Sequence, residues 1–87
     1  MVYMMKHGDG VYLVNRQSGI ATLIGKALAF RDGYSPCPGY WTYEQQVLVE
    51  TTQAPVQSVK RWYKLHDVAN YEQVVTIGYT IDERAGQ

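Results

Sequence analysis

The stretch QAPVQSVKRWYKLH, Gln53–His66, decides the fold because it can be placed on a strand or on a helix. As a strand, Val56–Leu65 splits into Val-Ser-Lys-Trp-Lys and Gln-Val-Arg-Tyr-Leu, and neither face is cleanly apolar. As a helix it separates into an apolar side and a polar side. The apolar side holds Val56, Val59, Trp62, Tyr63 and His66, and the polar side holds Gln57, Lys60, Arg61 and Lys64. The stretch therefore predicts a helix from about Pro55 to His66, with the proline in its first turn.

The preceding segment is compatible with both conformations. Thr42 is followed three residues later by Gln45, the spacing of a helix capping box, which favours a helix over Tyr43–Thr52. The same segment also alternates as a strand does, at Trp41, Tyr43, Gln45, Val47, Val49 and Thr51. Taken alone the two interpretations are evenly balanced. The helix expected after the turn at Gln53-Ala54 favours the first, and together they form a helix-turn-helix over residues 42–66.

TYEQQVLVETTQAPVQSVKRWYK, Thr42–Lys64, resembles the two-helix unit of bacterial, phage and plasmid DNA-binding regulators. Leu48, Ala54, Val59 and Trp62 stand where that unit keeps its apolar contacts. The later segment YEQVVTIGYTIDERA is loosely similar to the region after the two-helix unit in plasmid TrfB-type repressors. The resemblance implies a sequence-specific transcriptional regulator, a repressor of phage or plasmid type that binds double-stranded DNA as a homodimer.

Seven residues are the candidate DNA contacts on this interpretation. Gln57, Ser58 and Arg61 would face base edges, where Gln pairs with adenine and Arg with guanine. Phosphate contacts would come from Lys60 and Lys64 on the second helix and from Thr42 and Tyr43 near the start of the first. The competing explanation is that these side chains form an ordinary solvated helix face.

The rest of the chain predicts a sheet and one more helix. Met1–Val14 predicts a hairpin with its turn at Gly8-Asp9-Gly10, and Gly19–Arg31 predicts a helix capped by Ser18. Asp32–Gly39 predicts a loop, and the alternating, tyrosine-rich Tyr71–Ile81 predicts a strand that would form the dimer face. The expected fold is one α+β domain over residues 1–87. A small sheet, made of the N-terminal hairpin and the C-terminal strand, flanks a helical core that contains the helix-turn-helix.

Composition narrows the functional class. Of 87 residues 46% are hydrophobic and 18% charged, which indicates a folded chain, and the net charge of zero argues against a general nucleic-acid coat protein. The single cysteine, Cys37, cannot form an intramolecular disulfide or a cysteine-based zinc site. His7 and His66 lack further ligands at metal-binding spacing, so no metal or cofactor is expected. Without an apolar run of about 18 residues or a signal-peptide layout, we expect a cytoplasmic protein and no membrane partner.

Enzymatic activity is not expected, since the sequence holds no nucleophile elbow, phosphate loop, paired-carboxylate motif or His-x-x-x-His. The alternative function is a compact β-rich protein-interaction module, such as a small phage-encoded inhibitor of a host protein. Its contact anchors would be Trp41, Tyr43, Trp62 and Tyr63. This alternative requires Tyr43–Thr51 and Ser58–Leu65 to be paired strands.

Overall fold

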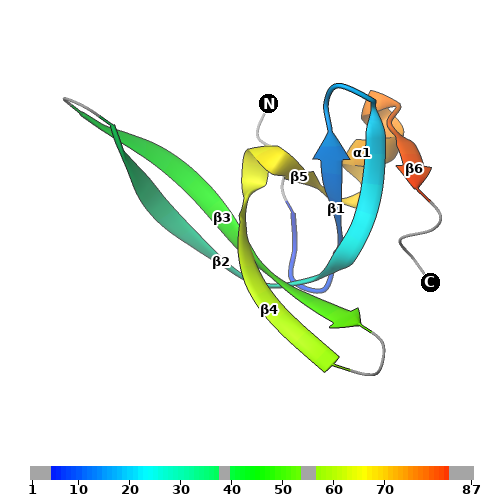
Figure 1. The fold of residues 1–87 in the computed structure, drawn as a ribbon, viewed down its shortest axis with the longest axis horizontal. Coiled ribbons are helices and arrows are strands. Elements are labelled where there is room, and N and C mark those ends of the chain that lie inside the picture. The colour runs from blue at the N-terminus through cyan, green and yellow to red at the C-terminus, as the bar shows by residue number, and fades with distance from the viewer. Residues whose placement is uncertain (1–4, 38–39, 54–56, 83–87) are drawn as a thin grey trace.

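The computed structural model of the chain describes residues 5–37, 40–53 and 57–82, with side chains described for 5–33, 44–51 and 59–82. Most of the described chain is strand, and the helical parts are short (Figure 1). In chain order the elements are β1 (Gly10–Asn15), β2 (Ile20–Cys37), β3 (Tyr40–Gln53), β4 (Gln57–Lys64), the 3₁₀ turn η1 (Leu65–Asp67), β5 (Val68–Ala69), α1 (Tyr71–Ile77) and β6 (Thr80–Asp82).

The strands form one sheet in the order β4-β3-β2-β1-β5, with antiparallel neighbours throughout. β6 lies off this path and runs parallel to the first residues of β2. β2 thus pairs with three strands: β1 and β6 along its first residues, and β3 from Lys26 onward. The far halves of β2 and β3 extend away from the other elements as a long two-stranded arm (Figure 1).

The sheet bends where β2 passes from β1 to β3, and Gly25 makes this bend possible. Lys26 pairs with Gly10 of β1 and with Glu50 of β3, and the register with β1 shifts next to Gly25. Gly25 has φ +156°, and a Cβ there would lie 2.0 Å from the carbonyl oxygen of Glu50. The adjacent Ile24 carbonyl accepts a 2.5 Å hydrogen bond from the Thr51 hydroxyl. The bulge therefore keeps a hydrogen-bond partner while bringing the β3 backbone close.

Two hydrophobic clusters lie on opposite faces of the sheet, because side chains alternate along β1. Val11 of β1 belongs to the first cluster, with Ala27, Val47, Val49 and Val68. Val14 belongs to the second cluster, with Ala21, Ala69 and Val74 of α1. Helix α1 therefore covers one face of the β1–β2 region, while β3 and β4 fold over the other.

Helix α1 begins and ends with strong local signals. The Asn70 side chain accepts a hydrogen bond of 2.9 Å from the Gln73 amide, and Gly78 closes the helix at φ 90°. Val74 is fully buried, whereas Tyr71, Val75 and Ile77 are more than half exposed. The helix therefore buries one central residue, and Tyr71 at its start adds a ring contact with Tyr12 of β1, with the centroids 6.3 Å apart.

The expected α+β fold with a helical core is wrong: the described chain is mainly antiparallel sheet with one short α-helix. The helix expected over Gly19–Arg31 is a strand, most of β2. Its apolar residues recur at helix-like spacing because the register shifts twice, beside Gly25 and between Ala27 and Ala29. Each bulge adds one residue and moves the next apolar side chain out of the strand's two-residue period.

The helix-turn-helix expected over residues 42–66 is also wrong. Its two halves are β3 and β4, which pair antiparallel from Gln46 opposite Lys64 to Gln53 opposite Gln57. β3 has the strand alternation noted in the sequence, with Val47 and Val49 buried. β4 lacks a clean apolar face because it is an edge strand whose two faces both carry packed and exposed side chains, and this mixture imitates an amphipathic helix.

Three smaller expectations also change. Tyr71–Ile81 is not a strand: Tyr71–Ile77 is α1, and only Thr80–Asp82 is extended. The loop expected over Asp32–Gly39 is strand as far as Cys37, and residues 38–39 lie outside the described chain. The turn around Gly8 is present, with the Asp9 amide bonded to the Lys6 carbonyl. The first four residues of the expected N-terminal hairpin lie outside the described chain, and β1 pairs with β2 and β5.

Across the described ranges, no helix is long and apolar enough to cross a membrane. The cytoplasmic location stays a prediction.

Candidate binding surface on strand β4

The seven residues expected to contact DNA do not gather in one place. Thr42 and Tyr43 lie on the arm, opposite Ser35 and Tyr34, and Gln57 and Ser58 begin β4, opposite Gln53 and Thr52. Along β3, eleven residues separate Thr42 from Gln53, the residue opposite Gln57, which is about 37 Å of extended chain at about 3.4 Å per residue. The side chains of these four residues lie outside the described side chains.

The other three candidates, Lys60, Arg61 and Lys64, lie on β4 and are exposed. Since side chains alternate along a strand, Lys60 and Lys64 point to one face of the sheet and Arg61 to the other. The single basic face expected from a helix is therefore split. The three cations instead line both sides of the same strand edge.

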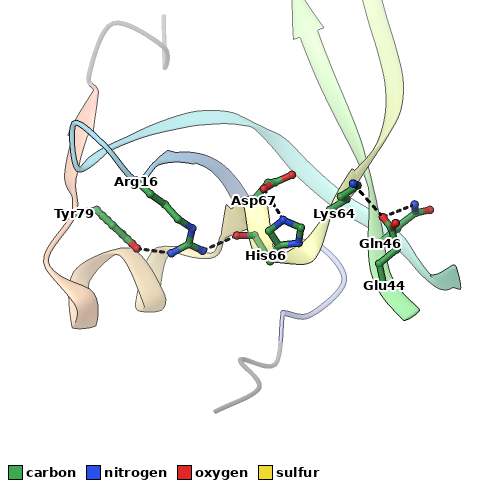
Figure 2. Close-up of polar contacts among 7 residues, drawn as sticks. All are labelled: Arg16, Glu44, Gln46, Lys64, His66, Asp67 and Tyr79. Carbon is green, nitrogen blue, oxygen red and sulfur yellow. Dashed lines mark hydrogen bonds and ion pairs between the residues drawn. The ribbon is translucent and has the colours of Figure 1, made fainter. Parts of the chain in front are cut away.

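The face that carries Lys60 and Lys64 is polar around one aromatic ring. The Arg31 guanidinium lies 4.0 Å from the ring centre of Trp62 and donates a 2.6 Å hydrogen bond to the Gln46 side chain. Gln46 in turn donates to Glu44, and Lys64 Nζ lies 4.0 Å from the same Glu44 oxygen (Figure 2). These contacts join β2, β3 and β4 on one surface and hold Trp62 under Arg31.

The opposite face of β4 continues the first hydrophobic cluster. Tyr63 packs against that cluster beside Leu65, and the Arg61 guanidinium lies 5.7 Å from the Tyr63 ring centre. Val59 on this face is 42% exposed. This face therefore offers an apolar strip with a cation beside it.

Strand β4 is an edge of the sheet. Within the described residues, β3 is the only strand that pairs with it, so its other edge offers backbone N–H and C=O groups over eight residues. Lys60 and Arg61 form no ion pair in the part of the chain whose side chains are described, although Glu50 lies opposite Lys60 in the register. The edge is therefore both open and positively charged.

A shallow cleft of about 490 Å³ adjoins β4 on the Tyr63 side. It is lined by Leu13, Val14, Asn15, Arg16, Thr22, Tyr63 and Asp67. Arg16 fixes its far wall: the guanidinium donates to the Tyr79 hydroxyl at 3.1 Å and to the His66 carbonyl at 2.5 Å (Figure 2). The cleft is open to solvent, and Leu13 at its wall is 41% exposed.

Sequence reasoning missed Arg16 and Arg31, which organise this surface. Both residues act on partners distant in sequence: Arg16 bonds His66 and Tyr79, and Arg31 stacks on Trp62. No local pattern marks such contacts. The two expected anchors Trp62 and Tyr63 lie on opposite faces of β4, and the side chains of Trp41 and Tyr43 are outside those described.

Among the described residues, no group of three or more His, Cys, Asp or Glu side chains is placed to hold a metal ion. The comparisons with known proteins add no relative: no family model, curated protein or solved structure matches this chain.

Proposed function

We propose that this protein is a protein-interaction module that binds an extended segment of another protein as an added strand on the edge of β4. The observation that carries the proposal is the edge of β4, eight residues long, which no other described strand covers and which carries Lys60, Arg61 and Lys64. The arm formed by β2 and β3 also has unpaired edges, but without such a run of cations. In strand addition, backbone hydrogen bonds supply affinity and the flanking side chains supply specificity.

Two features support this edge as a binding site. β4 is fixed in position, because it pairs with β3 along its full length and its Tyr63 packs on the first hydrophobic cluster. Its side chains also offer different chemistry on the two faces, with Trp62 under Arg31 on one and Val59 with Tyr63 on the other. A rigid strand loses little conformational entropy when a partner docks.

The pairing of β3 with β4 meets the structural condition of the alternative named from the sequence, which requires both segments to be strands. The DNA-binding prediction depends on a recognition helix over Pro55–His66. Within that range the described residues form β4 and η1 instead. Double-stranded DNA is therefore retained only as a competing outcome of the test.

The test is residue-by-residue amide hydrogen exchange on the full chain, alone and with extended peptides. In an antiparallel edge strand, alternate residues direct N–H and C=O away from the sheet. We expect every second amide between Val59 and Lys64 to exchange fast in the free protein. The probes are blocked eight-residue Val/Thr peptides that match β4 in length and carry acidic, neutral or basic substitutions.

A peptide that adds a strand will slow the fast amides of β4 and leave those of α1, around Val74, unchanged. If none of the peptides slows any β4 amide, strand addition is not what this edge does. If a mixed-sequence DNA duplex instead shifts the resonances of Lys60, Arg61 and Lys64, the protein-interaction proposal is replaced by DNA binding.

A further inference from the structure

We infer that the segment added to β4 is acidic, with carboxylates placed opposite Lys60, Arg61 and Lys64. This inference rests on the proposed strand addition and names the partner's chemistry. β4 carries three cations and no acidic residue between Gln57 and Lys64. Opposite charges on directly facing residues of neighbouring strands stabilise the pairing, whereas like charges destabilise it.

The charge of the edge is only partly balanced within the protein. Lys64 lies at 4.0 Å from Glu44, and its side chain remains about half exposed. Lys60 and Arg61 form no ion pair among the described side chains. A bound carboxylate would therefore meet two cations that carry no competing ion pair in that part of the structure.

The same charges disfavour a second copy of this chain as the occupant. Two β4 strands related by a two-fold axis place one residue opposite its own copy. If the axis passes Lys60 or Arg61, that cation faces the same cation of the second copy. If the axis passes Trp62, Lys60 faces Lys64 of the second copy. All three central registers bring like charges together, which argues for a different, acidic chain.

The geometry gives the acidic segment a pattern. Residues opposite Lys60 and Lys64 point to the Trp62 face and are four positions apart. The residue opposite Arg61 points to the Tyr63 face, next to the residue opposite Lys60. The partner segment therefore carries two adjacent acids, opposite Lys60 and Arg61. A third acid, opposite Lys64, lies four positions from the one opposite Lys60. Its residue opposite Tyr63 lies on the side of the cleft and is expected to be apolar.

A single-stranded nucleic acid is also anionic but fits the edge less well. Its backbone cannot pair with the outward N–H and C=O groups of β4, and one face of the Trp62 ring is already covered by Arg31. An acidic peptide uses both the charges and the hydrogen-bonding edge.

The experiment compares the acidic, neutral and basic peptides by affinity and by amide exchange at β4. We expect the acidic peptide to bind about tenfold more tightly than the neutral one at low salt, with the gain falling as salt screens the charges. The basic peptide is expected to be the weakest. An oligothymidylate of eight nucleotides, chosen to match the strand, is the nucleic-acid control.

Three variants assign the effect to the edge. Lys60→Gln and Arg61→Gln are each expected to weaken the acidic peptide about two- to threefold and to leave the neutral peptide unchanged. The double variant K60E/R61E should reverse the order, so that the basic peptide binds more tightly than the acidic one. Lys6→Gln, at an exposed lysine on the turn before β1, removes the same charge outside β4 and should have no effect.

The outcomes separate the two proposals. If all three peptides slow the β4 amides with equal affinity, strand addition stands and the acidic partner is wrong. If none of them slows these amides, the proposed function itself fails. Tighter binding of the oligothymidylate than of the acidic peptide, lost in K60E/R61E, would overturn the inference in favour of a nucleic acid.

Discussion

Strand β2 and helix α1 are stabilised by different kinds of contact. β2 is held by pairing with other strands: β1 and β3, its neighbours along the chain, and β6, about 60 residues away. α1 is held by its own neighbours: Asn70 caps its start, and the Gly78 amide bonds the Val74 carbonyl at its end. The difference indicates that pairing between strands fixes the extended part of this fold, whereas local hydrogen bonds set where the one α-helix of the described residues begins and ends, and Val74 packs that helix on the sheet.

The largest test of this comparison is Gly25→Ala in β2. The new Cβ would meet the Glu50 carbonyl oxygen at 2.0 Å, at a φ that side chains rarely adopt. We expect a loss of about 3 kcal/mol in the free energy of unfolding, because both strain and overpacking act at a backbone contact. Urea denaturation measures it. Gly33→Ala is the matched control, because the Cβ added there would lie 3.5 Å from the nearest heavy atom. It should change the free energy of unfolding by less than about 0.5 kcal/mol.

The second test uses two adjacent valines of α1. In the helix Val74 is fully buried and Val75 is 58% exposed. Val74→Ala should therefore cost about 2 kcal/mol through lost burial and the cavity left behind, and Val75→Ala less than about 0.5 kcal/mol. If Tyr71–Ile81 were the alternating strand expected from the sequence, Val75 would be buried and Val74 exposed. Val75→Ala would then cost more stability than Val74→Ala. Equal losses at the two positions would contradict both assignments.

The smallest test concerns the local start of α1. Asn70→Ala removes the side-chain oxygen that accepts the Gln73 amide, and we expect a loss of about 1 kcal/mol. Asn70→Asp keeps an acceptor there and should restore most of the loss. Thermal unfolding of the two variants measures this difference, and an equal loss in both would assign the effect to burial of Asn70 rather than to capping.

The sequence contains some correct local signals that the prediction did not follow. The alternation at Val47 and Val49 indicates a strand, but the expected helix-turn-helix overrode it; the structure places both valines buried on β3. The turn at Gly8-Asp9 is visible from its residues. The prediction for β2 is wrong because two register shifts interrupt its alternation, and a bulge has no signature that distinguishes it from helical spacing.

The candidate surface is only partly predictable for the same reason. Exposure of Lys60, Arg61 and Lys64 follows from their charge whether the segment is a helix or a strand. Their division between two faces depends on β4 being a strand, and the openness of its edge depends on where β3 and β1 lie in the sheet. A single sequence does not contain that order. The Asn70 and Gly78 signals, in contrast, are present in the sequence but are outweighed there by the alternation of Tyr71–Ile81.

The parallel pairing of β6 with β2 also sets an order of folding. Ile20 pairs with Thr80, which closes a loop of about 60 residues, whereas β3 and β4 are separated by residues 54–56 alone. We expect β3 and β4 to gain amide protection early in refolding and Thr80–Asp82 to gain it last. Until β6 docks, the start of β2 has an additional unpaired edge beside the exposed Ile20. That late intermediate, rather than the native protein, is where self-association during expression should begin.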